Sequence, residues 1–205
     1  MARQVVEATC DTAGLTQGSS VLEVGAGSGA FTLAWEERTR FVALDISHGL
    51  LLANPAARKV ESDAFHLPFA SDSFDLVFAG AILHHLTDVV GSLREMSRVS
   101  RRFVAAIEPN RNNPALAAFG LLVPEERGLL PFTSRWLSHQ ALRAGLTVDI
   151  STPFGWISPN NTPGILLPLL QRLPLGHPLC LNILLVARKT QPKSLERHPA
   201  RAAEI

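Results

Sequence analysis

The 205-residue sequence contains no tyrosine and only two cysteines, and both shortages exclude kinds of chemistry. A phenolic general base is excluded because no residue can supply one. Cys10 and Cys180 lie far apart and form no Cys-x-x-Cys pair, so neither a disulfide framework nor a metal site is predicted, and a cytoplasmic location is the expectation. The formal net charge is only +1, which gives no electrostatic reason to expect a nucleic-acid partner.

Long apolar runs and internal repeats are also missing. A membrane-spanning helix needs about 20 apolar residues, so no transmembrane segment is predicted. Residues 2–10 lack the continuous apolar core of a signal peptide and indicate an amphipathic helix that ends at Gly14. With 46% hydrophobic residues the chain can bury one core. We expect a single domain over residues 1–188 and a disordered tail over residues 189–205.

Short apolar runs alternate with helical patterns along the chain. Helices are expected to begin at Thr87 or Asp88 and at Thr133 or Ser134, and the second is expected to end at Gly145. Strands are expected at residues 21–24, 41–45, 58–61, 74–79, 103–108, 146–151 and 179–187. Such alternation predicts an α/β fold whose parallel sheet is covered by helices on both faces.

A glycine-rich turn follows the first of these strands. Gly25, Gly27 and Gly29 let the chain bend from strand into a helix expected over residues 30–37 while a ligand lies against bare backbone. The spacing Gly25-x-Gly27-x-x-Ala30 also satisfies the dinucleotide fingerprint. Glu23 opposes that reading, because a carboxylate repels pyrophosphate but suits a ligand with an ammonium and a sulfonium. S-adenosylmethionine has both groups.

At this motif the sequence resembles the class I S-adenosylmethionine-dependent methyltransferases, whose first motif is an acidic residue, a spacer and Gly-x-Gly-x-Gly. Asp45 ends the second strand at the interval expected of a ribose-binding carboxylate. Asp63-Ala64, the segment 82–88 and the segment 95–99 complete a pattern similar to the type 11 group over about residues 15–110. The resemblance implies a Rossmann-like, doubly wound, mainly parallel sheet of seven strands with the last antiparallel.

The resemblance also implies the residues that bind the cofactor. Asp63 would accept from the adenine amino group, and the backbone NH of Ala64 would meet a ring nitrogen. The alternatives are that Asp45 caps the helix near Ser47 and that Asp63 only forms a turn; Asp75, which precedes a strand, is expected to be structural. The cofactor-binding residues are predicted to be Glu23, Gly25, Ala26, Gly27, Gly29, Asp45, Ile46, Asp63, Ala64 and Ala79.

The acceptor site is expected beyond the carboxyl ends of the fourth, fifth and sixth strands. His85, and secondarily His84, can act there as a general base or can merely hold the next helix. Glu108, Asn110 and Arg111 are the candidates for binding the acceptor, or else form a turn with Arg111 in solvent. The fourth strand is not followed by the Asn-Pro-Pro-Tyr type of tetrapeptide, which disfavours methylation of a nucleobase amine.

Two apolar segments, 116–123 and 165–173, follow strands at the same edge. Segment 165–173 is expected to be a buried lid, a pocket wall for a greasy acceptor, a dimer contact or a patch that rests weakly on a membrane, and the two segments together are expected to enclose the acceptor. The sequence therefore predicts methyl transfer from S-adenosylmethionine to a small molecule that is apolar or lipid-like. The alternatives are a nicotinamide-dependent oxidoreductase and a catalytically silent cofactor-binding protein.

Overall fold

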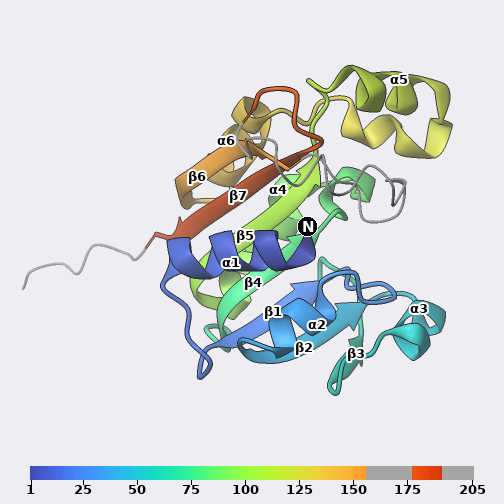
Figure 1. Ribbon diagram of the computed structural model, residues 1–205. Coiled ribbons are helices and arrows are strands. Elements are labelled where there is room, and N and C mark those ends of the chain that lie inside the picture. The colour runs from blue at the N-terminus through green and yellow to red at the C-terminus, as the bar shows by residue number, and fades with distance from the viewer. Residues whose placement is uncertain (156–176, 191–205) are drawn as a thin grey trace, which may run out of the picture.

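A twisted seven-stranded sheet runs through the computed structural model, which describes residues 1–155 and 177–190 (Figure 1). The strand order is β3-β2-β1-β4-β5-β7-β6, and β7 alone runs against its neighbours β5 and β6. The strands are β1 (Ser20–Val24), β2 (Arg40–Asp45), β3 (Lys59–Glu61), β4 (Phe74–Gly80), β5 (Ser100–Pro109), β6 (Leu146–Phe154) and β7 (Asn182–Lys189). This topology confirms the doubly wound, mainly parallel sheet expected from the sequence.

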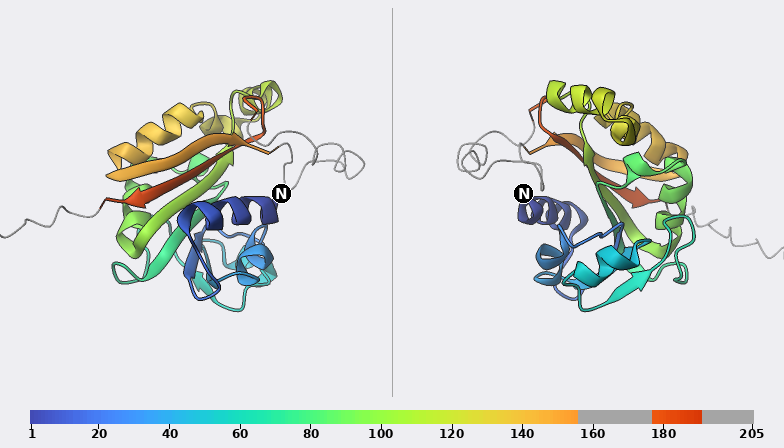
Figure 2. Two further views of the ribbon diagram at one scale, coloured as in Figure 1. Left: turned by 60° about the vertical axis from the view of Figure 1, so that its left-hand side comes forward. Right: turned by 90° about the vertical axis from the view of Figure 1, so that its right-hand side faces the viewer.

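Helices cover both faces of the sheet, as the two side views show (Figure 2). One face packs against α1 (Ala2–Ala13), α2 (Thr32–Glu36) and α3 (His48–Ala53), and the other against α4 (Val89–Val99) and α6 (Ser134–Arg143). Because side chains alternate along a strand, Val21 enters the first core and Leu22 the second. Each face therefore buries its own hydrophobic core, and the strands between them are apolar on both sides.

Local signals place most helix ends where the sequence predicts them. Asp88 accepts a hydrogen bond from Gly91 N at the start of α4, and Thr133 accepts one from Trp136 N at the start of α6. Gly14, with φ +59°, ends α1 in the left-handed conformation. The helix expected over residues 30–37 is shorter, because α2 begins only at Thr32.

The remaining elements extend from the carboxyl edge of the sheet. They are two 3-10 helices, η1 (Leu83–His85) and η2 (Pro124–Leu129), and α5 (Pro114–Leu122). The α5–η2 segment folds back on itself beyond β5 (Figure 1), and η2 packs against η1. Residues 165–173 and 191–205, for which an apolar segment and most of a disordered tail are predicted, lie outside the described residues.

Candidate active site

The glycine turn lies where the strand order reverses, between the carboxyl ends of β1 and β4. Gly25 has φ +73°, and a Cβ added there would collide with the Ile82 side chain. Gly27 has φ +50°, but a Cβ there would meet nothing closer than Leu50 Cδ1 at 4.0 Å. Gly25 is thus required by packing against the protein, whereas the space beside Gly27 is open to a ligand.

Asp45 at the end of β2 holds this turn in place. Its Oδ2 accepts from Gly27 N at 2.8 Å, and its Oδ1 accepts from Ser47 N at 2.8 Å. Ser47 caps α3 with its own hydroxyl, so Asp45 is not the helix cap. Each carboxylate oxygen keeps a second lone pair, which leaves capacity for the predicted ribose hydroxyls. Asn54 adds a 2.9 Å hydrogen bond to Gly27 O from the adjoining segment.

Glu23 lies in β1, two residues before Gly25, and is only 1% exposed. Its Oε2 has no hydrogen-bond partner among the described residues. Burial, and after it the negative charge of Asp45, raises the pKa of this carboxyl well above its usual value. A buried carboxyl with an unpaired oxygen beside the glycine turn fits a cofactor that carries an ammonium group.

A narrow apolar cavity of about 150 Å³ opens beside Asp45. The predicted residues Ile46, Asp63 and Ala64 line it, and Leu86 adds to its wall. Asp63 Oδ1 already accepts from Phe65 N at 2.6 Å and His66 N at 2.9 Å. Partial burial works to raise the pKa of Asp63, but these hydrogen bonds and the His66 pair lower it overall, so the carboxylate stays charged.

Ala79, the remaining predicted cofactor residue of β4, is fully buried in the second core and lines neither this cavity nor the larger one beside it. Gly29 also stays off both cavity walls. A Cβ on Gly29 would run against Pro55 and Asn54, so this glycine allows the turn to pack on the segment after α3.

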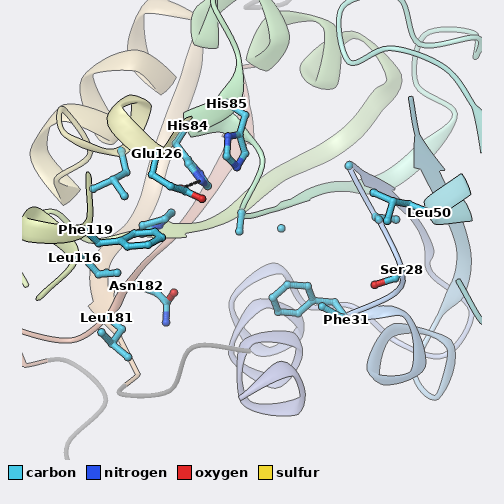
Figure 3. A pocket seen from close by; sticks show the side chains of 18 residues that line it. Ser28, Phe31, Leu50, His84, His85, Leu116, Phe119, Glu126, Leu181 and Asn182 are labelled. Atoms are coloured by element: carbon cyan, nitrogen blue, oxygen red, sulfur yellow. Dashed lines mark ion pairs between the residues drawn. The ribbon is translucent and has the colours of Figure 1, made fainter. Parts of the chain in front are cut away.

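A larger cavity of about 430 Å³ begins at the glycine turn and ends at η1, α5 and η2. In Figure 3, Ser28 and Leu50 lie on one side and His84, His85 and Glu126 on the other. Apolar side chains line much of the cavity on both sides: Phe31, Leu50, Leu116, Phe119, Leu129 and Leu181. Segment 116–123 therefore contributes to the cavity through Leu116 and Phe119, while Leu121 and Leu122 are exposed.

His84 lies between two carboxylates. Its Nδ1 is 2.7 Å from Glu108 Oε2, and its Nε2 is 3.5 Å from Glu126 Oε2. The side chain is only 4% exposed. Burial works to lower the pKa of His84, yet the hydrogen bond and charge of Glu108, with Glu126, raise it overall.

His85 has the opposite electrostatic balance. Its ring centroid lies 4.0 Å from that of His84, and its side chain lines the cavity. Partial burial, followed by the charge of His84, lowers the pKa of His85. The two histidines that the sequence singles out thus lie together on the cavity wall, in different charge environments.

The structure gives the three predicted acceptor-binding residues other surroundings. Glu108 is fully buried; its Oε1 accepts from Leu83 N at 2.8 Å and Ile82 N at 3.1 Å, so it fixes η1. Asn110 is also buried and donates to the carbonyls of Pro178 and Cys180. None of Glu108, Asn110 and Arg111 lines the cavity. The exposed Arg111 donates to Leu130 O at 3.3 Å.

Glu126 is a charged cavity residue that the sequence does not predict. It follows the apolar segment 116–123 in an ordinary Pro-Glu-Glu sequence, and only the return of η2 onto η1 brings it to His84. A Cβ on Gly128 would strike the backbone carbonyl of His84, so the close approach of η2 requires glycine at that position.

The class of protein follows from this geometry and from one family match. Residues 22–103 match the model of the family described as Methyltransferase domain. Together with the doubly wound sheet and the glycine turn, this match makes the chain similar to the class I S-adenosylmethionine-dependent methyltransferases. The family indicates S-adenosylmethionine as the cofactor, and the match goes against the oxidoreductase alternative.

Curated relatives share the name demethylmenaquinone methyltransferase. The protein of Mycolicibacterium paratuberculosis is 35% identical over 122 residues, which cover 58% of this chain and 53% of the relative. That of Corynebacterium glutamicum (strain R) is 33% identical over 128 residues, 60% of this chain and 56% of the relative. The chain therefore spans about half the length of these relatives.

Solved structures agree over most of the chain. A SAM-dependent methyltransferase from Archaeoglobus fulgidus has a TM-score of 0.66 at 17% identity and covers 92% of this chain and 95% of its own. One from Mesorhizobium loti has a TM-score of 0.64 at 21% identity, with 89% and 96% covered. At these identities the likeness establishes the fold. None of the helices within residues 1–155 and 177–190 is long and apolar enough to cross a membrane.

Proposed function

We propose that this chain transfers a methyl group from S-adenosylmethionine to a small-molecule acceptor bound between the glycine turn and the α5–η2 segment. One observation carries the proposal: the larger cavity joins Gly25, Gly27 and Ser28 on one wall to His84, His85 and the apolar residues on the other. Donor and acceptor can therefore share one cavity, and direct displacement at a methyl carbon needs the two to lie side by side.

The residues around the turn suit the cofactor. Glu23 and the backbone of the glycine turn would hold the amino-acid end, Asp45 the ribose, and the narrow cavity lined by Ile46, Asp63 and Ala64 the adenine. The cofactor supplies a methyl group on a positively charged sulfur, which is already activated for transfer. The protein therefore contributes chiefly by binding, by orientation and by keeping water away.

The acceptor side suits a molecule that is largely apolar. Leu116, Phe119 and Leu129 would contact its apolar part, while His84 and His85 are the candidate catalytic side chains on the same wall. The curated relatives, which are named for demethylmenaquinone, a quinone, lend support to an apolar acceptor. Burial of such an acceptor would contribute roughly 25 cal/mol for each Å² of apolar surface removed from water.

Calorimetric titration with S-adenosylhomocysteine, and in parallel with NAD, tests cofactor choice. We expect a single site for S-adenosylhomocysteine and none for NAD. Transfer of labelled methyl from S-adenosylmethionine to a panel of quinols, phenols, fatty acids and polar amines then tests the reaction. Absence of S-adenosylhomocysteine binding would contradict the proposed function. Binding of S-adenosylhomocysteine without methyl transfer to any acceptor of the panel would favour a catalytically silent cofactor-binding protein.

A further inference from the structure

Three potential metal ligands converge on the wall of the larger cavity. His84, His85 and Glu126 each offer one ligand atom, and these atoms all lie within 4.8 Å of one another. Two imidazoles and one carboxylate form a ligand set suited to divalent transition metals. The sequence offers no sign of this cluster, because Glu126 comes from η2, about 40 residues after the histidines.

The separation of His84 Nε2 and Glu126 Oε2 is informative. At 3.5 Å it exceeds the usual 2.7–3.2 Å of an N–H···O hydrogen bond. Two ligand atoms that share one tetrahedral zinc ion at about 2.1 Å each lie about 3.4 Å apart. The gap is therefore long for a hydrogen bond and close to what one bridging ion requires.

Glu108 supplies the support that metal-binding histidines generally have. The fully buried Glu108 places its Oε2 2.7 Å from Nδ1 of His84, which directs Nε2 of the same ring toward Glu126. A carboxylate on the far nitrogen of a ligating histidine fixes its tautomer and ring orientation. The same carboxylate holds the backbone of Ile82 and Leu83, so the direction of the ring is set by the fold.

We infer that His84, His85 and Glu126 bind one divalent transition-metal ion of the zinc class on the acceptor side of the cavity. Three protein ligands leave a position open toward the cavity, as in catalytic rather than structural metal sites. If the chain has the proposed function, an oxygen donor of the acceptor, such as a phenol or quinol hydroxyl, would occupy this open position. His85 then acts as a ligand rather than as a free base.

Metal binding can be measured without any turnover. Untagged full-length protein is stripped with a chelator, exchanged into chelator-free buffer and titrated with Zn²⁺ by calorimetry. We expect one ion per chain that is bound at least tenfold more weakly by Glu126→Gln. The neighbouring Glu125→Gln is the matched control, because Glu125 is exposed and lines no part of the cavity; its affinity should equal that of the wild type.

Co²⁺ provides a second readout of the ligand set. We expect visible absorption bands of four- or five-coordinate Co²⁺ that disappear in Glu126→Gln and persist in Glu125→Gln. Equal Zn²⁺ affinity in the two variants, absence of saturable binding, or a thiolate charge-transfer band from Cys10 or Cys180 would each overturn the inference. S-adenosylhomocysteine is titrated into the same samples to separate the two proposals. A protein that does not bind S-adenosylhomocysteine contradicts the proposed function, whereas the metal result still stands.

Discussion

Replacement of Glu23 by glutamine should stabilise the protein in the absence of cofactor and weaken cofactor binding at the same time. Glu23 is 1% exposed, its Oε2 lacks a partner among the described residues, and nearby Asp45 adds negative charge. Ionisation of such a carboxyl is costly unless a cation arrives. Glutamine keeps the size and shape of the side chain and removes the charge.

The pH dependence follows from the direction of the pKa shift. The folded pKa of Glu23 is raised well above 4.5, so the folded protein holds this proton more tightly than the unfolded chain does. Its contribution to stability is fully present below about pH 4.5 and is lost as the pH rises through the folded pKa. Within that window the free energy of unfolding should fall by up to about 1.4 kcal/mol per pH unit from this group.

The effect should be visible in thermal unfolding. At pH 7 we expect Glu23→Gln to gain about 1–3 kcal/mol over the wild type, which is about 2–4 °C in melting temperature for each kcal/mol. At pH 4.5 the two proteins should unfold at nearly the same temperature. Glu37→Gln, at an exposed position of the following segment, is the control and should shift little at either pH.

Cofactor should reverse the order of stability. A charge-assisted contact to the cofactor ammonium contributes about 1.5–3 kcal/mol, so Glu23→Gln should bind S-adenosylhomocysteine about ten- to a hundredfold more weakly. With saturating ligand the wild type should then melt above the variant. A variant that is less stable than the wild type at pH 7, with the same pH slope, would refute the reasoning, because Glu23 would then be ionised and well paired.

Further predictions concern the two walls of the cavity. Asp45→Ala should weaken S-adenosylhomocysteine binding by about 2 kcal/mol in calorimetry, and unchanged affinity would contradict its assignment to the ribose. Gly27→Val should abolish binding because the side chain enters the cavity; Gly14→Val, at a similar φ of +59° but remote from the site, measures the strain alone and should bind normally. Phe119→Ala should raise the KM of apolar acceptors about tenfold, from about 1–2 kcal/mol of lost contact, with cofactor affinity kept. Leu122, on the same helix, is 80% exposed, so Leu122→Ala should leave that KM unchanged. An equal rise in KM for the two variants would contradict the role of Phe119 in the apolar wall.

The meeting of the glycine turn with Asp45 could be predicted because the two are encoded close together. The glycine turn and Asp45 are separated by one short helix and one strand, and parallel pairing of β1 with β2 brings them into hydrogen-bond contact. Gly25 and Gly27 carry their own signal, because positive φ and missing side chains are properties of the residue itself. Ala79 is also predicted to bind the cofactor, but alternation along β4 turns its side chain into the second core.

The acceptor side could be predicted only in part. The histidines stand out in sequence, but whether a buried carboxylate orients His84 depends on the register between β4 and β5, which places Glu108 beneath η1. Glu108 and Asn110 are polar residues at a strand end, where sequence reasoning expects ligand contacts. In the structure they satisfy backbone groups of η1 and of the segment before β7 instead.

The two sides of the site are held mainly by different contacts, and they meet at Ile82, which packs against Gly25 and donates its backbone N–H to Glu108. The Asp45–Gly27 hydrogen bond belongs to β1 and β2, whereas the acceptor wall depends on Glu108 under η1 and on Gly128, which lets η2 approach the His84 carbonyl. A larger residue at position 128 would displace Glu126 from His84 without any contact to the glycine turn. Changes in α5 and η2 can therefore alter which acceptor binds, or whether an ion binds, while the turn keeps its geometry, because the hydrogen bonds described for Gly27 and Asp45 involve neither α5 nor η2.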